Sequence, residues 1–279
     1  MKTIDAHIHI FERPYSDLLD NSHVKEGEAG ELHLFEEYRR RHDIEAAFVI
    51  CHEDGPCPRN SGFVASLGES RRWIHSFGHA RPGLPAFAAD VRRVLGEGHF
   101  GVSCYLREDD PAAWLADDAL APVWEELAGR GVPLSLTIWP RQCGSLRRVA
   151  RRFGELSVLV NHMGRPPLVD GKLDVELYQE VLALAEFGNV GVKLSGAYAF
   201  SAAGWLWPQS DLFPALDLLR RDFGAGRLLF ASDFSPVLEY NTYQQALEFL
   251  RVGYGGFPEA ELELVHHANA RRIIAGRGA

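Results

Sequence analysis

The chain has 279 residues, of which 46% are hydrophobic and 24% charged, a balance typical of a globular protein with a sizeable core. Its formal net charge of −9 argues against nucleic acid and anionic membranes as partners, because both require a basic surface. No apolar run reaches the ~20 residues of a membrane span, and no cleavable leader is expected before the first strand. None of the four cysteines has C-x-x-C spacing. We therefore expect a cytoplasmic protein with reduced thiols.

The first predicted strand carries two histidines. Residues 4–11 read Ile-Asp-Ala-His-Ile-His-Ile-Phe, and side chains alternate along a strand, so His7 and His9 should project to one side. The opposite face should hold the apolar residues Ile4, Ala6, Ile8 and Ile10. Among 12 histidines such a pair arises easily by chance, and two histidines hydrogen-bonded inside a barrel are the alternative. The place of the pair near the end of the first apolar strand favours a functional role.

Seven further apolar runs follow, at residues 46–51, 74–79, 101–106, 133–139, 157–162, 190–195 and 228–233. Most are nearly continuous, as expected for parallel strands buried on both faces. Amphipathic helix patterns lie between them, the clearest at residues 118–130, 142–153 and 174–187. This alternation predicts an α/β fold, a (β/α)8 TIM barrel, as a single domain over residues 1–279. The competitor is an open doubly wound sheet, which usually carries a glycine-rich phosphate loop that this sequence lacks after its first strand.

Polar residues gather where the predicted strands end, and in a barrel these ends form the active-site face. The last strand ends in Asp233, which comes to lie beside His7 and His9 if the first and last strands meet. Two imidazoles and a carboxylate suit either a divalent metal ion or a general acid–base pair. The sixth strand ends in His162, which is expected to serve the reaction, with a core histidine as the alternative. Because buried polar groups cost free energy unless they are paired, packing alone does not explain this concentration.

Five segments resemble a known family in their order and spacing. They are Asp5-Ala6-His7-Ile8-His9, Asn161-His162-Met163-Gly164-Arg165-Pro166, Lys193-Leu194-Ser195-Gly196, Ser232-Asp233 and Asn269-Ala270-Arg271-Arg272. Over nearly its whole length the chain resembles the amidohydrolase superfamily, and within it the lactonase-like amidohydrolase 2 family related to 2-pyrone-4,6-dicarboxylate hydrolase. The resemblance implies a barrel enzyme of the lactonase type.

One departure from the family pattern bears on metal binding. Many metal-dependent members carry a histidine at the end of strand five and some a lysine on strand four, whereas this chain has Thr137 and Trp139, and Tyr105-Leu106-Arg107, at those places. A two-metal site is therefore not expected. One divalent ion, with zinc as the first choice, would rest on His7, His9 and Asp233, completed by water or substrate. A metal-free mechanism stays open, because the resemblance implies that some relatives work without metal.

The function that these residues favour is hydrolysis of a small cyclic ester, such as a carboxylated or a sugar lactone. Asp233 would take the proton of the attacking water, and His162 with His7 and His9, or the ion, would polarise the carbonyl. A metal-dependent non-oxidative decarboxylase of an unsaturated or aromatic carboxylic acid is the alternative, disfavoured by the missing strand-five histidine. A non-catalytic ligand-binding barrel fits less well, because a binding protein has little use for a base beside such a site.

The residues expected to contact the substrate follow the strands. The arginines Arg81, Arg107 and Arg165 could clamp a carboxylate through their bidentate guanidinium groups, or form structural salt bridges instead. Tyr105 and Trp139 are expected to form pocket walls. Residues 197–211 read as a long loop after the seventh strand, which would cover the site or contact a second copy in a homo-oligomer.

Overall fold

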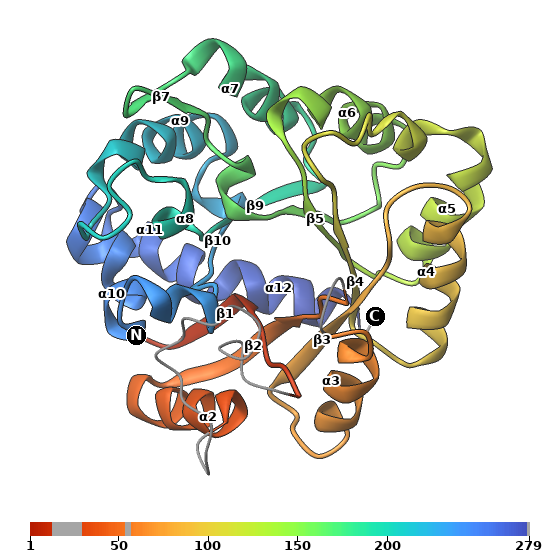
Figure 1. The fold of residues 1–279 in the computed structure, drawn as a ribbon, viewed down its shortest axis with the longest axis horizontal. Coiled ribbons are helices and arrows are strands. Elements are labelled where there is room, and N and C mark those ends of the chain that lie inside the picture. Colours follow the sequence, from red (N-terminus) through yellow and green to blue (C-terminus); the bar gives the residue numbers. More distant parts are fainter. Residues whose placement is uncertain (13–29, 54–56, 278–279) are drawn as a thin grey trace.

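The computed structural model describes residues 1–12, 30–53 and 57–277, which form a ring of eight parallel strands surrounded by helices (Figure 1). Neighbouring strands follow the order β1-β2-β3-β4-β5-β6-β9-β10. The ring closes between its first and last strands, where Ile8 and Phe234 form a parallel bridge and the Asp233 amide donates to the His7 carbonyl at 2.9 Å. The prediction of a (β/α)8 barrel is therefore confirmed.

The strands of the ring are β1 (Thr3–Ile8), β2 (Ile44–Ile50), β3 (Ile74–His79), β4 (Gly101–Tyr105), β5 (Leu134–Thr137), β6 (Val158–Val160), β9 (Val190–Leu194) and β10 (Leu228–Phe230). A separate antiparallel hairpin, β7 (Leu168–Val169) with β8 (Lys172–Leu173), was not expected from the sequence. The helices are α2 (Glu31–His42), α3 (Asn60–Gly68), α4 (Ala86–Gly96), α5 (Ala121–Gly129), α6 (Cys143–Arg152), α7 (Val175–Leu182), α8 (Ala197–Phe200), α9 (Phe213–Phe223), α10 (Tyr243–Glu248), α11 (Glu259–Glu263) and α12 (Asn269–Gly276).

Each strand buries both of its faces, and β2 illustrates how. Its residue Phe48 packs with Phe77 in a cluster that lines the inside of the ring. Its next residue, Val49, packs with Phe35 of α2 in a cluster between the ring and the helices. This two-sided burial is the physical reason for the nearly continuous apolar runs in the sequence.

The strand β1 departs from regular alternation. Its register against β2 shifts between Asp5 and Ile8. As a result, Ile4 and Ala6 pack in the cluster that lines the ring, whereas Ile8 and Ile10 pack in the cluster beneath the helices. The prediction that these four residues share one face is therefore wrong, because an irregularity in the ladder reverses the alternation at this point.

The strands that lead to the site are shorter than the apolar runs. β5, β6 and β10 end at Thr137, Val160 and Phe230, so the polar residues that follow stand on turns rather than on strands. The predicted helices at residues 118–130 and 174–187 begin or end in 3₁₀ turns. Residues 197–211, expected as a loop, begin with the short helix α8 and expose the Trp205 side chain, which is 70% accessible.

The structure pairs none of the four cysteines in a disulfide, and Cys51, Cys104 and Cys143 are buried. Burial raises the pKa of the Cys51 and Cys143 thiols above the usual range, which keeps them protonated and unreactive. In the part of the chain that the structure describes, no helix is both long enough and apolar enough to cross a membrane.

Candidate active site

Three side chains meet where β1 and β10 end. The Nε2 atoms of His7 and His9 lie 3.1 Å apart, and the Oδ1 atom of Asp233 lies 3.6 Å from the first and 3.4 Å from the second. All three residues are buried. The closure of the ring between its first and last strands brings them together, because Asp233 lies three residues beyond the end of β10.

Neighbouring groups fix the orientation of these side chains. Nδ1 of His9 lies 2.8 Å from the Ile50 carbonyl oxygen, which can only accept, so His9 carries a proton on Nδ1 and turns Nε2 toward the site. The Tyr198 hydroxyl donates to Oδ2 of Asp233 at 2.7 Å, which leaves Oδ1 facing the histidines. Asp233 has a φ of 61°, a left-handed conformation that costs a non-glycine residue about 1–2 kcal/mol and often marks functional sites.

A left-handed turn after β6 carries a third histidine. His162, Met163, Gly164 and Arg165 have φ values of 53°, 56°, 69° and 58°. The amide of Gly164 donates to the Asn161 carbonyl at 3.0 Å, and the amide of Arg165 donates to the His162 carbonyl at 2.8 Å. Three of these four residues are not glycine and are strained in this conformation, so the surrounding structure must hold them there.

The helix α7 holds this turn in place. The Tyr178 hydroxyl donates to the Met163 carbonyl at 2.6 Å. A Cβ atom at Gly164 would lie 2.5 Å from Val181, so only glycine allows the turn to pack so closely against the helix. The packing of α7 against this turn therefore fixes the backbone that carries His162.

His162 lies against the other site residues. Its ring centroid is 4.7 Å from that of His7, and its Nδ1 atom is 3.8 Å from Oδ2 of Asp233. The same Nδ1 atom makes a hydrogen bond of 2.9 Å with the Ser195 hydroxyl, which follows β9. Four strand ends, those of β1, β6, β9 and β10, thus contribute to one buried cluster.

Burial and mutual contacts determine the charges in this cluster. Burial raises the pKa of the Asp233 carboxyl, but His162, His9 and Tyr198 outweigh this effect and hold that pKa at about 2. Burial lowers the pKa of His162 to about 4 and the pKa of His7 well below 6.5. At neutral pH the site therefore contains an ionised Asp233 beside neutral His7 and His162.

The donor atoms of this cluster have the spacing of metal ligands. Atoms bound tetrahedrally at about 2.1 Å from one ion lie about 3.4 Å apart. The three separations among His7 Nε2, His9 Nε2 and Asp233 Oδ1 are 3.1, 3.4 and 3.6 Å. Donor atoms of His7, His162 and Asp233 also lie within 4.8 Å of one another. Imidazole lone pairs with a carboxylate are a donor set that suits zinc, so the residues present could hold one divalent ion.

A buried lysine near the site was not anticipated as a site residue. Lys193 of β9 is fully buried and donates from Nζ to the Ser135 hydroxyl at 2.8 Å. The Ser135 hydroxyl donates in turn to the Asn161 side-chain oxygen at 2.9 Å. Burial lowers the pKa of the Lys193 ammonium well below 10.5, against the attraction of Asp233. The signal available in the sequence was a single charged residue within the apolar run of residues 190–195.

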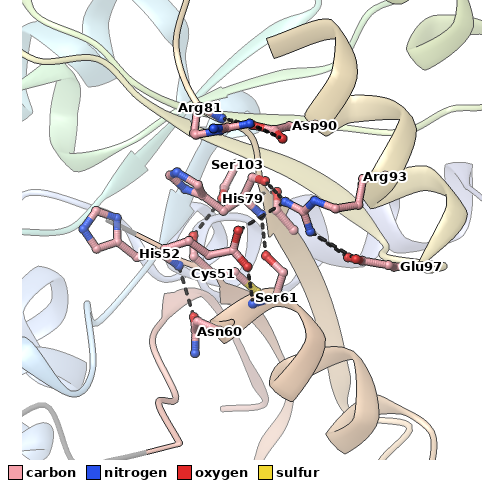
Figure 2. Close-up of polar contacts among 12 residues, drawn as sticks. Cys51, His52, Asn60, Ser61, His79, Arg81, Asp90, Arg93, Glu97 and Ser103 are labelled. Atoms are coloured by element: carbon pink, nitrogen blue, oxygen red, sulfur yellow. Dashed lines mark hydrogen bonds and ion pairs between the residues drawn. The ribbon is translucent and has the colours of Figure 1, made fainter. Parts of the chain in front are cut away.

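The three arginines predicted to contact substrate have different surroundings. Arg81 donates from Nε and Nη2 to the carboxylate of Asp90 at 2.8 and 3.1 Å (Figure 2). The Arg107 side chain is 85% exposed and its Nε atom lies 3.3 Å from Asp109. The guanidinium carbon of Arg165 lies 3.9 Å from the centroid of the Trp139 ring. The structure thus brings Arg165 and Trp139 together and places Arg81 and Arg107 beside acidic neighbours.

The ends of β2, β3 and β4 carry a second polar group of residues. Tyr105 lies with its ring centroid 4.7 Å from that of His52 and 6.0 Å from that of His79. Arg93 of α4 donates to the His79 carbonyl at 2.8 Å and pairs with Glu97 at 2.9 Å, on the side of β3 away from the two histidine rings (Figure 2). Arg93 also pairs with Glu53 at 3.2 Å.

Comparison with known proteins identifies relatives over most of the chain. A family model described as "Amidohydrolase" matches residues 4–275. The L-fucono-1,5-lactonase of Burkholderia ambifaria is 29% identical over 156 residues, which cover 52% of this chain and 50% of that protein. The chain spans about half the length of the curated relatives that it matches.

Solved structures of the same architecture cover nearly all of the chain. An amidohydrolase from Burkholderia multivorans with bound zinc has a TM-score of 0.78 at 19% identity and covers 99% of both chains. A candidate 2-pyrone-4,6-dicarboxylic acid hydrolase from Pseudomonas putida has a TM-score of 0.73 at 21% identity, covering 98% and 97%. A 5-carboxyvanillate decarboxylase from Sphingomonas paucimobilis has a TM-score of 0.62 at 13% identity, covering 98% and 99%. At these identities the structures establish the fold alone.

Proposed function

The chain belongs to the amidohydrolase family, and we propose that it hydrolyses a small cyclic ester, with Asp233 as the base that receives a proton from the attacking water. One observation carries this proposal: His7, His9 and His162 lie 3.6, 3.4 and 3.8 Å from the carboxylate oxygens of Asp233. Opening an ester with water requires an acceptor for the proton and donors for the carbonyl oxygen. The cluster supplies both kinds of group.

Asp233 is arranged as the proton acceptor. Its pKa of about 2 keeps the carboxylate ionised at neutral pH, and the Tyr198 hydroxyl on Oδ2 leaves Oδ1 available. A carboxylate with so low a pKa is a weak base toward bulk water, so the attacking water must become more acidic than in solution. A divalent ion on His7, His9 and Asp233, with zinc favoured by the donor set, would supply this chemistry by lowering the pKa of water and polarising the carbonyl.

His162 is arranged to assist at the carbonyl oxygen. Because the pKa of His162 is about 4, its ring is neutral at pH 7. When the Ser195 hydroxyl donates to Nδ1, the ring hydrogen resides on Nε2 and can be donated to the substrate. Loss of one such donor lowers kcat by roughly 10²–10³-fold in comparable sites.

The proposed substrate is a small lactone, either carboxylated or derived from a sugar. The relationship to an L-fucono-1,5-lactonase supports the sugar class. The similarity in fold to a candidate hydrolase of 2-pyrone-4,6-dicarboxylate is compatible with the carboxylated class. The fold similarity to a decarboxylase does not favour decarboxylation, because fold alone does not specify the reaction.

The test is a panel of carboxylated and sugar lactones, with ring opening recorded through proton release. In Asp233→Asn the side chain keeps its size but cannot accept the proton, so we expect kcat to fall by roughly 10³-fold while the lactone Kd changes by less than about threefold. The control is Asp118→Asn, whose side chain is 89% exposed on the outer surface. Metal content is measured in each variant, so that a lost ion is distinguished from a lost base.

Two outcomes would contradict the proposal. Unchanged turnover in Asp233→Asn would remove this residue from the mechanism. Release of carbon dioxide from aromatic or unsaturated carboxylic acids, without opening of any lactone, would assign the site to a decarboxylase.

A further inference from the structure

A buried carboxylate joins the segments that follow β1 and β10. Glu31, the first residue of α2, is only 2% exposed. Its Oε2 atom accepts a hydrogen bond from the Phe11 amide at 2.8 Å, and its Oε1 atom accepts one from the Ser235 hydroxyl at 2.6 Å. These two donors lie 20 and 204 residues from Glu31 in the chain, so one side chain links three distant segments.

The two donors stand close to residues of the site. Phe11 is the second residue after His9, and its ring stacks on the His9 imidazole, with the centroids 5.7 Å apart and the planes at 8°. Ser235 is the second residue after Asp233. The Glu31 carboxylate therefore holds the backbone just beyond His9 on one side and just beyond Asp233 on the other.

The strands themselves do not reach these positions. Because β1 and β10 end before His9 and Asp233, the strand ladders do not set the separation between these two side chains. The Asp233 amide donates to the His7 carbonyl, and the His9 amide donates to the Phe234 carbonyl. A segment that is held at one end only can pivot about that end. The hydrogen bonds of Glu31 hold both segments again, beyond Phe234 on one of them.

Helix α2 supports this carboxylate from outside the ring, where it packs on β2 (Figure 1). Residues four apart lie on one face of a helix, and Phe35 places its ring 5.2 Å from the ring of Phe234. The same face of α2 thus contacts the segment after β10 through an apolar ring and through Glu31. A carboxylate in the first turn is also favoured by the positive end of the helix dipole.

We propose that Glu31 is a positioning residue for the reaction, because it sets the separation between His9 and Asp233 from outside the site. This inference rests on the proposed lactonase function. The Nε2 atom of His9 and the Oδ1 atom of Asp233 lie 3.4 Å apart, and in the proposed reaction both contact the same water or ion. Catalytic groups must be held within about 0.5 Å of their working positions, and a displacement of about 1 Å lowers a rate by roughly 100-fold. Glu31 acts on this distance through Phe11 and Ser235.

The kinetic test compares two replacements of Glu31. Glu31→Leu removes both acceptors, and we expect kcat for the lactone to fall by more than about 30-fold while KM changes by less than about threefold. In Glu31→Gln the amide oxygen accepts from Phe11 and the amide nitrogen donates to the Ser235 hydroxyl, which can also accept, so kcat should stay within about threefold of the wild type. Ser235→Ala loses one of the two hydrogen bonds and should lower kcat by an intermediate factor. Equal losses in Glu31→Leu and Glu31→Gln would assign the effect to the charge and overturn the positioning role.

A control of matched burial separates positioning from lost stability. Asn269 is also 2% exposed and donates to the carbonyls of Ala225 and Leu228 at 2.7 and 2.8 Å, where β10 begins, at the opposite end of the strand from the site. Asn269→Leu should lower the urea midpoint of unfolding about as much as Glu31→Leu, because each change leaves two buried polar partners unpaired, and should leave kcat within about threefold. A similar loss of kcat in both variants would reduce Glu31 to a structural role and overturn the proposal.

Crystal structures of chelator-treated protein separate this inference from the proposed reaction, because without an ion only the protein holds the two side chains apart. In Glu31→Leu we expect the distance between His9 Nε2 and Asp233 Oδ1 to differ from 3.4 Å by more than about 0.5 Å, and in Glu31→Gln and Asn269→Leu by less. An unchanged distance in Glu31→Leu would overturn the inference whatever the activity. A changed distance in a protein that hydrolyses no lactone would contradict the proposed function while supporting the role of Glu31 in setting this distance.

Discussion

The two halves of the barrel mouth differ in whether their charged side chains are paired with opposite charges. In the site half, formed by the residues after β1, β6, β9 and β10, the Asp233 carboxylate faces neutral imidazoles and the Arg165 cation faces aromatic rings. In the paired half, formed by the residues after β2, β3 and β4 with helix α4, Arg81 binds Asp90 and Arg93 joins two glutamates. Charges that satisfy one another stabilise the barrel, whereas charges held away from an opposite partner are available to substrate and ion.

The largest expected effect comes from removing the imidazoles of the site half. In the double variant His7→Ala/His9→Ala we expect turnover to fall by roughly 10³-fold or more, because both the proposed ion and the polarising groups are lost. Mass spectrometry of tag-free protein should show about one zinc or manganese per chain in the wild type and none in the variant. His267→Ala, which removes a hydrogen bond with Glu45 outside the site, is the control. Wild-type protein that hydrolyses lactones but takes up no metal from added zinc would favour the metal-free mechanism.

In protein from which a chelator has removed metal, lowering the pH should reduce the stability that the site half contributes before it affects the paired half. The pKa of His162 is about 4 in the folded state and near 6.5 when unfolded, so the unfolded chain takes up the proton first as pH falls. The free energy of unfolding should therefore decrease from pH 6.5 to pH 4, by at most about 3 kcal/mol from this residue. The free energy of unfolding, measured with urea at each pH, should depend less steeply on pH for His162→Asn than for the wild type.

The matched variant in the paired half is Asp90→Asn. Burial raises the pKa of Asp90, but the hydrogen bonds from Arg81 outweigh this and keep that pKa below 3.8. The stabilisation from this pair is therefore complete above pH 3.8 and is lost only at lower pH. Asp90→Asn should shift the free energy of unfolding by a similar amount at every pH between 6.5 and 4. A changed pH dependence of the free energy of unfolding in this variant, or an unchanged one in His162→Asn, would contradict the proposed difference between the two halves.

The smallest expected effect is a change in stability within the paired half. Arg93→Met removes a hydrogen bond to the His79 carbonyl and two ion pairs from a side chain that is 35% exposed. We expect the free energy of unfolding to fall by about 1–2 kcal/mol, because solvent screens part of the attraction. The kcat/KM for the lactone should stay within about threefold. A tenfold loss of activity at unchanged stability would assign this half to the binding machinery.

The barrel itself could be predicted from the sequence, because strands buried on both faces leave nearly continuous apolar runs at regular intervals. The meeting of Asp233 with His7 and His9 follows from closure of the ring, which any eight-stranded barrel requires. The irregularity in β1 could not be predicted, because its residues have ordinary strand propensities and only the pairing with β2 reveals it.

The finer geometry of the site depends on contacts between distant segments. Lys193 and Ser135 are 58 residues apart, and Tyr198 and Asp233 are 35 apart, so no local pattern indicates either hydrogen bond. The pairing of Arg81 is likewise decided by where α4 places Asp90. The sequence predicts a strand as far as His162 and does not predict the left-handed turn, because histidine, methionine and arginine ordinarily avoid that conformation and packing against α7 overrides their preference.

The turn from His162 to Arg165 has a consequence for how this protein can evolve. His162, which is proposed to assist the reaction, and Arg165, which is predicted to contact the substrate, share one backbone segment, held in register by Gly164 against Val181. A substitution at position 165 exchanges only the side chain that is predicted to contact the substrate. An insertion or deletion displaces both groups together. Related proteins should therefore vary at position 165 while the length of this segment stays fixed. A laboratory library should randomise position 165 and keep Gly164.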